Sequence, residues 1–332
     1  MNAAIVGLGP VGLSYAETLS RIAGVRLAAV CDLDEPPEMA AAKYGAAPYR
    51  SYDDLLASGR ADVVCLAIPA RLREPYVRRA AERGLHVVCG KPLSFDPEEA
   101  RRIADACERC GVKLFVEHPL RFSPEYANLR RHAVSGAIGA IGVGHLKRVA
   151  GSDSRAAGTD LVFDHMLHDL DFVRWTLGDV KTVFAADRRT DRLHYMTATL
   201  RLCGGAIVNL ETVLGYPGPS GTEAELAGSN GLLRADSRAS RSLVVRKAGL
   251  RKSDEAGNDD TAAKPDADDS AAMPPGPVAK PTRQSALEHA IACIRDRCEP
   301  VMTAEDAVKA VELASAVARS ARTGMPVRLA SG

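Results

Sequence analysis

The sequence lacks several features that mark specialised classes of protein. It contains no run of eighteen apolar residues, so we expect no membrane-spanning helix. The start, from Met1 to Gly7, reads as a strand and a glycine turn, without the basic, apolar and cleavage regions of a secretory signal, so we expect a cytoplasmic protein. No G-x-S-x-G motif or paired cysteine–histidine arrangement points to nucleophilic hydrolysis.

Acidic and basic residues are almost equal in number, so the chain has little net charge. Lys and Arg number 43 and Asp and Glu number 42, which leaves a formal net charge of +1 at pH 7. A chain this close to neutral has no overall field to attract nucleic acid or an acidic membrane surface. Apolar residues make up 46% and charged residues 26% of the 332 residues, which predicts a globular protein of two domains.

The eight cysteines form no pattern typical of a disulfide framework or a metal site. They stand at positions 31, 65, 89, 107, 110, 203, 293 and 298. Cys31, Cys65 and Cys89 lie in or at the end of strand-like apolar runs, which indicates reduced, buried thiols in a cytosol. Cys107 and Cys110 have the spacing of a metal or redox pair. They lie in a helical pattern with no second pair, however, so we expect no metal there.

Strand and helix patterns alternate through the first 117 residues. Apolar strand-like runs cover residues 3–6, 25–31, 61–68, 86–89 and 113–117. Helical patterns cover residues 12–23, 39–44, 52–58, 73–83 and 97–110. Strands that are apolar throughout and separated by helices predict a parallel sheet covered on both faces. We therefore expect an α/β domain of the Rossmann type over residues 1–117.

The pattern changes after residue 118, where β-rich segments follow one another with turns between them. Helices are predicted at 124–135, 161–177, 286–297 and 304–323, and strands at 180–187, 195–202, 206–214, 223–226, 243–246 and 326–329. This order predicts an α+β second domain, residues 118–332, with an open, mostly antiparallel sheet.

Residues 251–282 hold seven acidic residues, five prolines and almost no large apolar side chain, so we expect a disordered surface insertion there rather than a substrate lid.

A glycine-rich turn between the first strand and the first helix is the clearest cofactor motif. The motif is Gly7-Leu8-Gly9-Pro10-Val11-Gly12. Its first glycine permits a tight turn, the second lets the backbone approach a pyrophosphate, and the third lets the helix pack close to the strand. The helix start adds free N–H groups and the positive end of the helix dipole. The alternative is a glycine turn that binds nothing or binds a flavin.

Asp32 ends the second strand twenty positions after Gly12 and completes the dinucleotide motif. Its carboxylate can accept hydrogen bonds from the ribose hydroxyls of adenosine, and its charge would repel a 2′-phosphate. The motif therefore predicts NAD as the cofactor. NADP stays open if Arg71 or Arg73 offsets the charge of Asp32.

Two further segments carry residues suited to catalysis. Lys91 follows a buried strand in the segment Gly90-Lys91-Pro92 and would stand at the carboxyl edge of the sheet, where ligands bind; the alternative is a solvated surface lysine. Asp164 and His168 are four residues apart at the start of a predicted helix, so they would share one face. A carboxylate beside an imidazole suits a general base, whereas the alternative is a capped helix start with a packed histidine.

Together these segments resemble the Gfo/Idh/MocA family, named for glucose–fructose oxidoreductase, inositol dehydrogenase and a rhizopine-catabolism protein. The resemblance covers nearly the whole chain. It is most specific in the Lys91-Pro92 turn and in the D-x-x-x-H-x-x-D pattern of residues 164–171. The other matching segments are 5–12, 31–32, 66–69, 84–93, 121–124, 164–178, 226–233 and 299–329.

The resemblance implies a Rossmann domain followed by an open sheet that often serves oligomerisation, so we expect a homodimer or homotetramer. It implies NAD(P)-linked hydride transfer at a secondary alcohol or ketone of a sugar, cyclitol or related polyol, which would be the small-molecule partner. The residues expected to bind the cofactor are Gly7, Gly9, Pro10, Val11, Gly12, Asp32, Ile68, Pro69 and Lys91.

The resemblance also assigns roles at the reacting centre. Lys91 matches the catalytic lysine, which would hydrogen-bond the substrate oxygen and stabilise charge there. His168 would exchange a proton with the substrate hydroxyl, and Asp164 would be its catalytic partner. Arg121 would lie near the substrate or nicotinamide, and His165 beside Asp164 is a further candidate for substrate binding. The Lys91-Pro92 bond is a candidate for the cis form.

The sequence departs from the family pattern at several positions. Gly90 stands where the family usually has a glutamate beside the lysine, and Arg73 stands where it often has a histidine. The glycine pair before the second-domain helix is reduced to Gly158-Thr159, and His165 is an extra imidazole. The loss of the glutamate affects the orientation and pKa of the lysine.

These departures leave alternatives to a sugar or cyclitol dehydrogenase. One is an active enzyme with an anionic substrate, since Arg73 and Arg121 are basic. Another is a non-catalytic NAD-binding protein on the same fold, and a third is an NAD-dependent oxidation–elimination enzyme. Asp164, His165 and His168 could together chelate a metal, but an acid–base pair explains their spacing equally well, so no metal is predicted.

Overall fold

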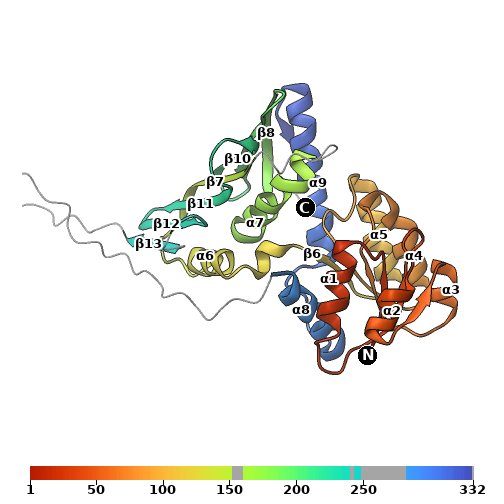
Figure 1. Cartoon of the computed structure of the whole chain (residues 1–332). Coiled ribbons are helices and arrows are strands. Elements are labelled where there is room, and N and C mark those ends of the chain that lie inside the picture. Colours follow the sequence, from red (N-terminus) through yellow and green to blue (C-terminus); the bar gives the residue numbers. More distant parts are fainter. Residues whose placement is uncertain (152–159, 240–242, 248–281, 331–332) are drawn as a thin grey trace, which may run out of the picture. The chain divides into compact units, whose positions relative to one another are not determined.

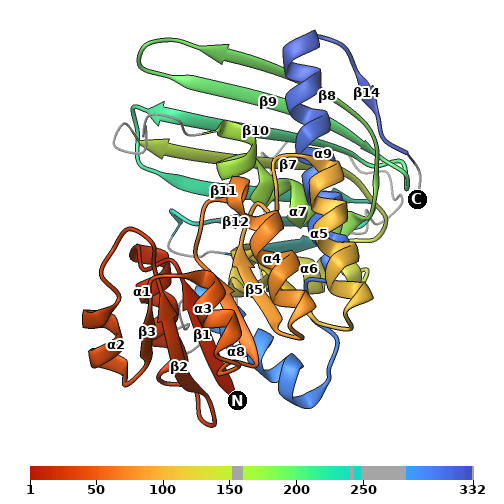
Figure 2. The same cartoon turned by 90° about the vertical axis from the view of Figure 1, so that its right-hand side faces the viewer.

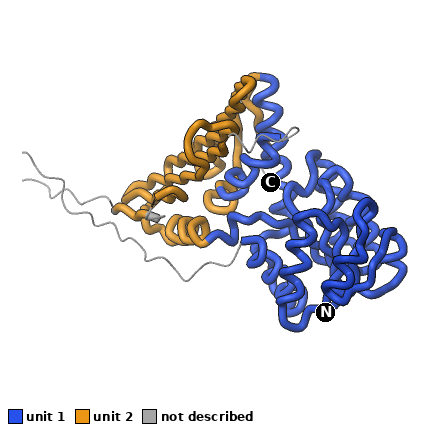
Figure 3. The backbone as a smooth tube through the Cα atoms, in the orientation of Figure 1, with its two compact units in different colours: residues 1–123, 158–172, 279–323 blue, residues 124–157, 173–278, 324–332 orange. Residues whose placement is uncertain are grey.

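The computed structural model describes residues 1–151, 160–239, 243–247 and 282–330. The predicted insertion at 251–282 lies outside the described residues except for Thr282, and Gly158-Thr159 lies outside them too. The chain forms two compact units, coloured separately in Figure 3. Unit 1 comprises Met1–Ser123, Gly158–Phe172 and Ala279–Thr323, and unit 2 comprises Pro124–Ala157, Val173–Val278 and Gly324–Gly332.

Unit 1 is built on a six-stranded parallel sheet with the strand order β3-β2-β1-β4-β5-β6. Its strands are β1 (Asn2–Val6), β2 (Arg26–Cys31), β3 (Ala47–Tyr49), β4 (Val63–Leu66), β5 (His86–Gly90) and β6 (Leu114–Glu117). This order and direction are those of a Rossmann fold, which confirms the fold predicted for the first part of the chain. The short strand β3 was not predicted, because Ala47-Pro48-Tyr49 is neither a long apolar run nor buried.

The helices of unit 1 lie where the sequence pattern places them, with small differences at their ends (Figure 1). They are α1 (Pro10–Leu19), α2 (Glu38–Tyr44), α3 (Tyr52–Ala57), α4 (Arg73–Glu82), α5 (Pro97–Arg109), α8 (Thr282–Asp296) and α9 (Ala304–Thr323), with the 3₁₀ turns η1 (Ala70–Leu72) and η2 (Pro119–Phe122). Gly84, predicted to end α4, has a φ of +74°, a left-handed conformation that glycine adopts without strain.

Unit 1 takes in α8 and α9, so the predicted boundary at residues 117 and 118 does not match the compact units. Leu287 and Ile291 of α8 are buried in one apolar cluster with Leu19 of α1 and Phe115 of β6. Helix α9 packs against α5 and β6. Amphipathic helices bury their apolar faces wherever the chain returns them to a sheet, and here they cover the sheet of the first domain.

Unit 2 contains an eight-stranded sheet with the order β13-β12-β11-β7-β10-β9-β8-β14. Figure 2 shows the long strands β7 to β10 of this sheet. Its strands are β7 (Ile141–Gly151), β8 (Val180–Arg189), β9 (His194–Leu202), β10 (Ile207–Tyr216), β11 (Gly221–Gly228), β12 (Gly231–Asp236), β13 (Leu243–Lys247) and β14 (Val327–Arg328). Neighbouring strands are antiparallel except β7 and β10, which confirms the mostly antiparallel sheet. Strand β7 was missed, since Gly142 and Gly144 interrupt its alternation.

Two helical segments connect the units along the chain. Helix α6 (Pro124–Val134) lies in unit 2 and packs against β12. A π-helical turn, η4 (Leu161–Met166), runs into α7 (Leu167–Leu177), which passes from unit 1 to unit 2 at residue 172. The sequence predicts one helix over residues 161–177, so the position is right but the π turn is new. Among the residues described, no helix combines the length and apolar character needed to cross a bilayer.

Candidate active site

The glycine turn between β1 and α1 requires glycine for two different reasons. Gly7 has a φ of +92°, and a Cβ there would stand 2.5 Å from the carbonyl oxygen of Ala67. A Cβ on Gly12 would stand 1.8 Å from the carbonyl oxygen of Gly7, so only glycine lets α1 approach β1 this closely. A Cβ on Gly9 would meet no atom within 4 Å. The space above Gly9 is therefore open to a ligand.

Helix α1 begins at this turn with Pro10 as its first residue and Gly9 as its N-cap. The backbone N–H groups of Val11 and Gly12, in the first turn of the helix, have no earlier helical carbonyl to bind. These groups and the positive end of the helix dipole suit the pyrophosphate of a dinucleotide. The turn thus has the shape and the donors that the sequence motif predicts.

Asp32, immediately after β2, is held with its carboxylate beside the glycine turn. Its Oδ2 accepts a hydrogen bond from the backbone N–H of Leu8, and its Oδ1 accepts from Asp34 (2.9 Å) and Glu35 (3.0 Å). Partial burial raises the pKa of Asp32, but these backbone donors outweigh it, and the pKa lies below its ordinary value. The residue is therefore anionic at neutral pH, as NAD selection requires.

A cleft of about 750 Å³ opens between α1 and α2, and its lining includes Leu8 and Glu35, whose N–H groups bind Asp32, but not Asp32 itself. Leu8, Leu13, Pro36, Met39 and Tyr44 supply apolar walls, with Gly9 at the turn. A flat aromatic base fits an apolar cleft, while Asp32 supplies the acceptor for a ribose. The residues that fit a dinucleotide are those of the glycine turn and Asp32.

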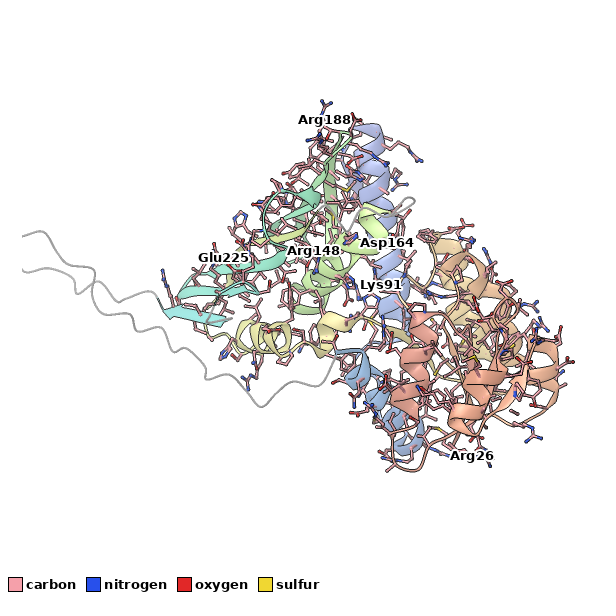
Figure 4. The ribbon with its side chains drawn as sticks, in the orientation of Figure 1. Arg26, Lys91, Arg148, Asp164, Arg188 and Glu225 are labelled. Atoms are coloured by element: carbon pink, nitrogen blue, oxygen red, sulfur yellow. The ribbon has the colours of Figure 1, made fainter. Side chains whose placement is uncertain are left out.

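Lys91 follows β5 at the carboxyl edge of the sheet, and the Lys91-Pro92 peptide bond is cis, as the sequence led us to expect. The Lys91 ammonium donates to the backbone carbonyl oxygen of Phe163 at 3.2 Å and to that of Asp164. The ring of Phe95 packs edge-on against that of Phe163, with the centroids 5.2 Å apart. The lysine turn and the start of the D-x-x-x-H helix thus meet within unit 1 (Figure 4).

Arg73, at the start of α4, forms hydrogen bonds with the backbone of the lysine turn. Its Nη1 donates to the carbonyl oxygens of Gly90 and Pro92, on either side of Lys91, and its Nη2 donates to that of Ile68 at 3.2 Å. The side chain is buried, so the hypothesis that Arg73 binds an anionic substrate is wrong. Its guanidinium instead satisfies carbonyl groups at the ends of β4 and β5.

Asp160 caps the π-helical turn, and Asp164, inside the turn, binds the backbone of this cap residue. Asp160 accepts hydrogen bonds from the N–H groups of Val162 and Phe163 at 2.9 Å each, and Asp164 Oδ2 accepts from the N–H of Asp160, also at 2.9 Å. This reciprocal arrangement is a capping box, in which two side chains satisfy the free N–H groups of a helix start. Asp164 therefore has the structural role that the sequence left open as an alternative, together with a position next to Lys91.

His165 and His168 lie in η4 and α7, and both are half-buried. Sequence spacing predicts a shared face for Asp164 and His168 in an α-helix, but η4 is π-helical, and its wider turn changes that relation. π turns are enriched at functional sites. Both histidines belong to the same compact unit as Lys91.

Arg121, predicted to lie near the substrate, is instead buried in an ion-pair cluster. Its Nε and Nη2 contact both carboxylate oxygens of Asp171 at 3.0 and 2.7 Å, and its Nη1 contacts Asp306 at 3.0 Å. His118 Nδ1 lies 3.3 Å from Asp171. Burial opposes ionisation of Asp171, but His118 and Arg121 hold its pKa well below the ordinary value. In this structure the donors of Arg121 are thus directed to Asp171, to Asp306 and to the carbonyl oxygen of Val301.

Glu117 is a polar residue at the sheet edge that sequence reasoning passed over. It ends β6 and is 6% exposed. Burial raises its pKa to about 7, although Tyr15, Arg283 and Arg73 act in the opposite direction. Lys91 was selected because it is a charged residue at the carboxyl end of a buried strand. Glu117 meets the same criterion, since it is the last residue of β6.

The cysteines and histidines show no sign of a metal centre in the described part of the chain. All eight cysteines are free thiols, and Cys31, Cys65, Cys89, Cys107 and Cys293 are buried. No cluster of three or more metal-ligating side chains occurs among the described residues.

Two models of one oxidoreductase family match the sequence. The one described as "Oxidoreductase family, NAD-binding Rossmann fold" matches residues 1–125, and the one described as "Oxidoreductase family, C-terminal alpha/beta domain" matches residues 150–329. Both carry the family name GFO_IDH_MocA.

Curated relatives include inositol and sugar dehydrogenases. Inositol 2-dehydrogenase 4 of Saccharopolyspora erythraea is 32% identical over 224 residues, which is 64% of this chain and 66% of the relative. The rhizopine catabolism protein MocA of Rhizobium meliloti is 30% identical over 54% of this chain and 58% of its own length. The match thus spans less than two thirds of these relatives. D-apiose dehydrogenase of Paraburkholderia graminis is 28% identical over 99% of this chain and 89% of its own length.

Solved structures share the fold over the whole chain. An oxidoreductase of Agrobacterium radiobacter, solved with NAD+, L-tartaric acid and magnesium, has a TM-score of 0.81 at 22% identity and covers 99% of this chain and 98% of its own. An NAD-binding oxidoreductase of Klebsiella pneumoniae has a TM-score of 0.83 at 20% identity, covering 100% of this chain and 99% of its own. With the glycine turn, Asp32 and the Lys91-Pro92 turn in place, the chain belongs to the Gfo/Idh/MocA oxidoreductase family, and its first part is the family's NAD-binding Rossmann domain.

Proposed function

We propose that the protein is an NAD-dependent oxidoreductase that acts on a secondary alcohol, or the corresponding ketone, of a sugar, cyclitol or related polyol. The observation that carries this proposal is the contact of the Lys91 ammonium with the backbone of Phe163 and Asp164. It joins the lysine at the sheet edge to the helix that bears His168. The names of the curated relatives, inositol 2-dehydrogenase and D-apiose dehydrogenase, support the same class of substrate.

NAD held at the glycine turn and Asp32 would supply the acceptor for a hydride from the carbinol carbon. The chain's own residues then have to bind the substrate hydroxyl and move its proton. Lys91 would turn its ammonium from the carbonyl oxygens of η4 to the substrate oxygen and stabilise the negative charge that develops there. His168 would take the hydroxyl proton, with Asp164 and His165 beside it as contacts for the remaining hydroxyl groups.

We also propose that the protein is cytoplasmic and assembles as a homodimer or homotetramer through the sheet of unit 2. Eight free thiols support a reducing compartment. The sheet exposes large apolar side chains on its strands, with Val143 at 41%, Phe184 at 45% and Ile207 at 46% exposure. Equilibrium sedimentation of the purified protein tests the assembly, and a single monomeric species would contradict it.

The test of the activity is turnover with NAD+ or NADH, monitored by the absorbance of the reduced nicotinamide. The substrates are a panel of sugars, inositols, amino-cyclitols and sugar acids. We expect turnover with at least one, and Lys91→Ala to reduce it about 10²–10³-fold while NADH binding persists. Lys181→Ala, an exposed lysine on β8, is the matched control. Tight NADH binding with no redox change on any substrate would contradict the proposal.

A further inference from the structure

Glu117 and Gly90 are direct neighbours at the carboxyl edge of the Rossmann sheet. They end β6 and β5, and they pair in register across these strands. Lys91 follows Gly90 directly, so the Glu117 backbone lies beside the start of the lysine turn. A residue at this edge is placed where parallel sheets bind their ligands.

The Glu117 carboxyl is buried without a full set of partners. Its Oε2 lies 3.4 Å from Nε of Arg283, which belongs to α8. The Tyr15 hydroxyl lies beside the carboxyl, yet neither this hydroxyl nor Oε1 of Glu117 makes a hydrogen bond of standard geometry with another described residue. A buried carboxyl is costly to ionise unless basic or hydrogen-bonding groups lie near it, so the neighbours of Glu117 decide its charge.

The side chain that Gly90 lacks would point at the same surroundings. A Cβ built on Gly90 stands 3.8 Å from Nη2 of Arg73 and 4.0 Å from the Tyr15 hydroxyl, which are ordinary contact distances. A glutamate at position 90 would therefore enter the space between Arg73 and Tyr15. Both groups already act electrostatically on Glu117.

Arg73 links this carboxyl to the lysine turn. It donates to the carbonyl oxygens of Gly90 and Pro92 and so holds both sides of Lys91. It is 6% exposed, and a buried guanidinium needs a nearby negative charge. Glu117 supplies such a charge from the adjacent strand.

We propose that Glu117 replaces, from β6, the carboxylate that position 90 lacks, and that it is a positioning residue which acts through Arg73 and Tyr15 on the Lys91 turn. This inference rests on the proposed function for its effect on turnover. The residues at 73, 90 and 117 then form one set: Gly90 leaves space beside Arg73, Arg73 binds the carbonyl groups on both sides of Lys91, and Glu117 balances the charge of Arg73.

The charge of Glu117 changes in the neutral range, since burial raises its pKa to about 7. The groups that face it are Tyr15 of α1, Cys65 of β4, Cys89 of β5, Arg73 of α4 and Arg283 of α8. His289 of α8 shares a small cavity with it. Because only the ionised carboxylate balances Arg73, we expect turnover to rise with pH through this range.

The first experiment compares Glu117→Gln, Gly90→Glu/Glu117→Gln and the exposed control Glu108→Gln with wild type. Glu117→Gln keeps the size of the side chain and should reduce kcat about tenfold or more, with the rise near pH 7 removed and NADH affinity unchanged. The double variant restores a carboxylate between Arg73 and Tyr15 and should recover most of the loss. If the wild type is active and Glu117→Gln changes neither its rate nor its pH profile, the inference is overturned.

A second readout does not depend on turnover. Reductive ¹³C-methylation labels Lys91, whose resonance is assigned by its loss in Lys91→Arg. We expect this resonance to shift between pH 6 and 8 in the wild type and to lose that shift in Glu117→Gln. An unchanged shift in Glu117→Gln would overturn the positioning role. If the wild type binds NADH but turns over no substrate, the proposed function fails, whereas the resonance still decides the link between Glu117 and Lys91.

Discussion

Arg121 and Asp171 form a buried bidentate ion pair, with Nε 3.0 Å from Oδ2 and Nη2 2.7 Å from Oδ1. The pair ties the turn after β6 to helix α7, although the two residues stand 50 positions apart in the chain. It gives the last aspartate of the D-x-x-x-H-x-x-D pattern a structural purpose. The helix that carries His168 is anchored to the Rossmann unit by this contact.

Removing one partner of this pair should strongly destabilise the protein. Asp171→Asn leaves Arg121 buried without its main counter-charge, so we expect the free energy of unfolding to fall by about 3–5 kcal/mol. Arg101→Met is the control, since its pair with Glu305 is exposed and should contribute less than about 1 kcal/mol. Urea denaturation of the full chain, followed by far-UV circular dichroism, measures both. Equal effects of the two substitutions would contradict the assignment.

The same pair predicts a dependence of stability on acid. The pKa of Asp171 is lower in the folded state than its unfolded value of about 3.9. Its contribution to stability is therefore fully present above the unfolded pKa and is lost as pH falls toward the folded pKa. Wild type should lose stability more steeply than Asp171→Asn between about pH 5 and pH 2. Parallel curves of unfolding free energy against pH would exclude this contribution.

Substitution by alanine should reduce stability at one glycine of the cofactor turn and cofactor binding at another. Gly12→Ala places a Cβ 1.8 Å from the carbonyl oxygen of Gly7, so we expect a loss of stability of about 1–3 kcal/mol or more. Gly9→Ala meets no atom within 4 Å and should fold normally, but its methyl group enters the space left for the pyrophosphate. We expect Gly9→Ala to weaken NADH binding about tenfold or more, a loss of about 1.4 kcal/mol.

Thermal melts and NADH fluorescence titrations of the two variants separate these effects. A Gly9→Ala protein that binds NADH as tightly as wild type would show that the cofactor does not approach this backbone. A Gly12→Ala protein of normal stability would show that α1 can move away from β1 at little cost.

Asp32 should decide between NAD and NADP. Its carboxylate is fixed by the N–H groups of Leu8, Asp34 and Glu35, so it cannot easily turn away from a 2′-phosphate. Asp32→Ser should weaken NADH binding and raise the ratio of NADPH to NADH affinity about tenfold or more. Glu17→Ser, an exposed residue on α1 that also lines the cleft, controls for a general change in charge. An unchanged ratio in Asp32→Ser would assign cofactor choice to other residues.

Asp164 combines a cap with a candidate role at the reacting centre, and two substitutions can separate these functions. Asp160→Ala removes the acceptor of two helix N–H groups and should cost about 0.5–2 kcal/mol of stability. Asp164→Asn retains an oxygen that can accept from the Asp160 N–H, so stability should change little. If Asp164 also acts on the substrate, its loss of charge should reduce kcat/KM about tenfold or more, with normal melting behaviour. Full activity in Asp164→Asn would show that Asp164 serves only its hydrogen bond with Asp160 at the start of the helix.

Local patterns were sufficient for the first domain and for the cofactor motif. The alternation of apolar runs with helical spacing predicted five of the strands and helices around them, because burial on both faces leaves a continuous apolar run in each parallel strand. The glycine spacing predicted the tight turn between β1 and α1, since Gly7 and Gly12 are each required by a close contact with backbone atoms nearby. β7 was missed because glycines interrupt its pattern.

The roles of the arginines and acids at the site could not be predicted in this way. Arg73 and Arg121 looked suited to an anionic substrate, yet both are buried and bound to internal partners. A charge in a sequence does not show whether its partner is a ligand or a residue far along the chain. Glu117 was passed over, because its importance depends on its register with Gly90 on the neighbouring strand.

The Rossmann fold, the glycine turn with Asp32, and the two segments that carry Lys91 and His168 could all be predicted from the sequence alone. These features depend on periodicity and on contacts between near neighbours in the chain. Contacts between distant segments, in contrast, place α8 and α9 in the first unit, pair Asp171 with Arg121, and set the π turn that Asp160 caps beside Lys91. Such features depend on where distant segments meet and on which charges are removed from water there, and local spacing contains neither.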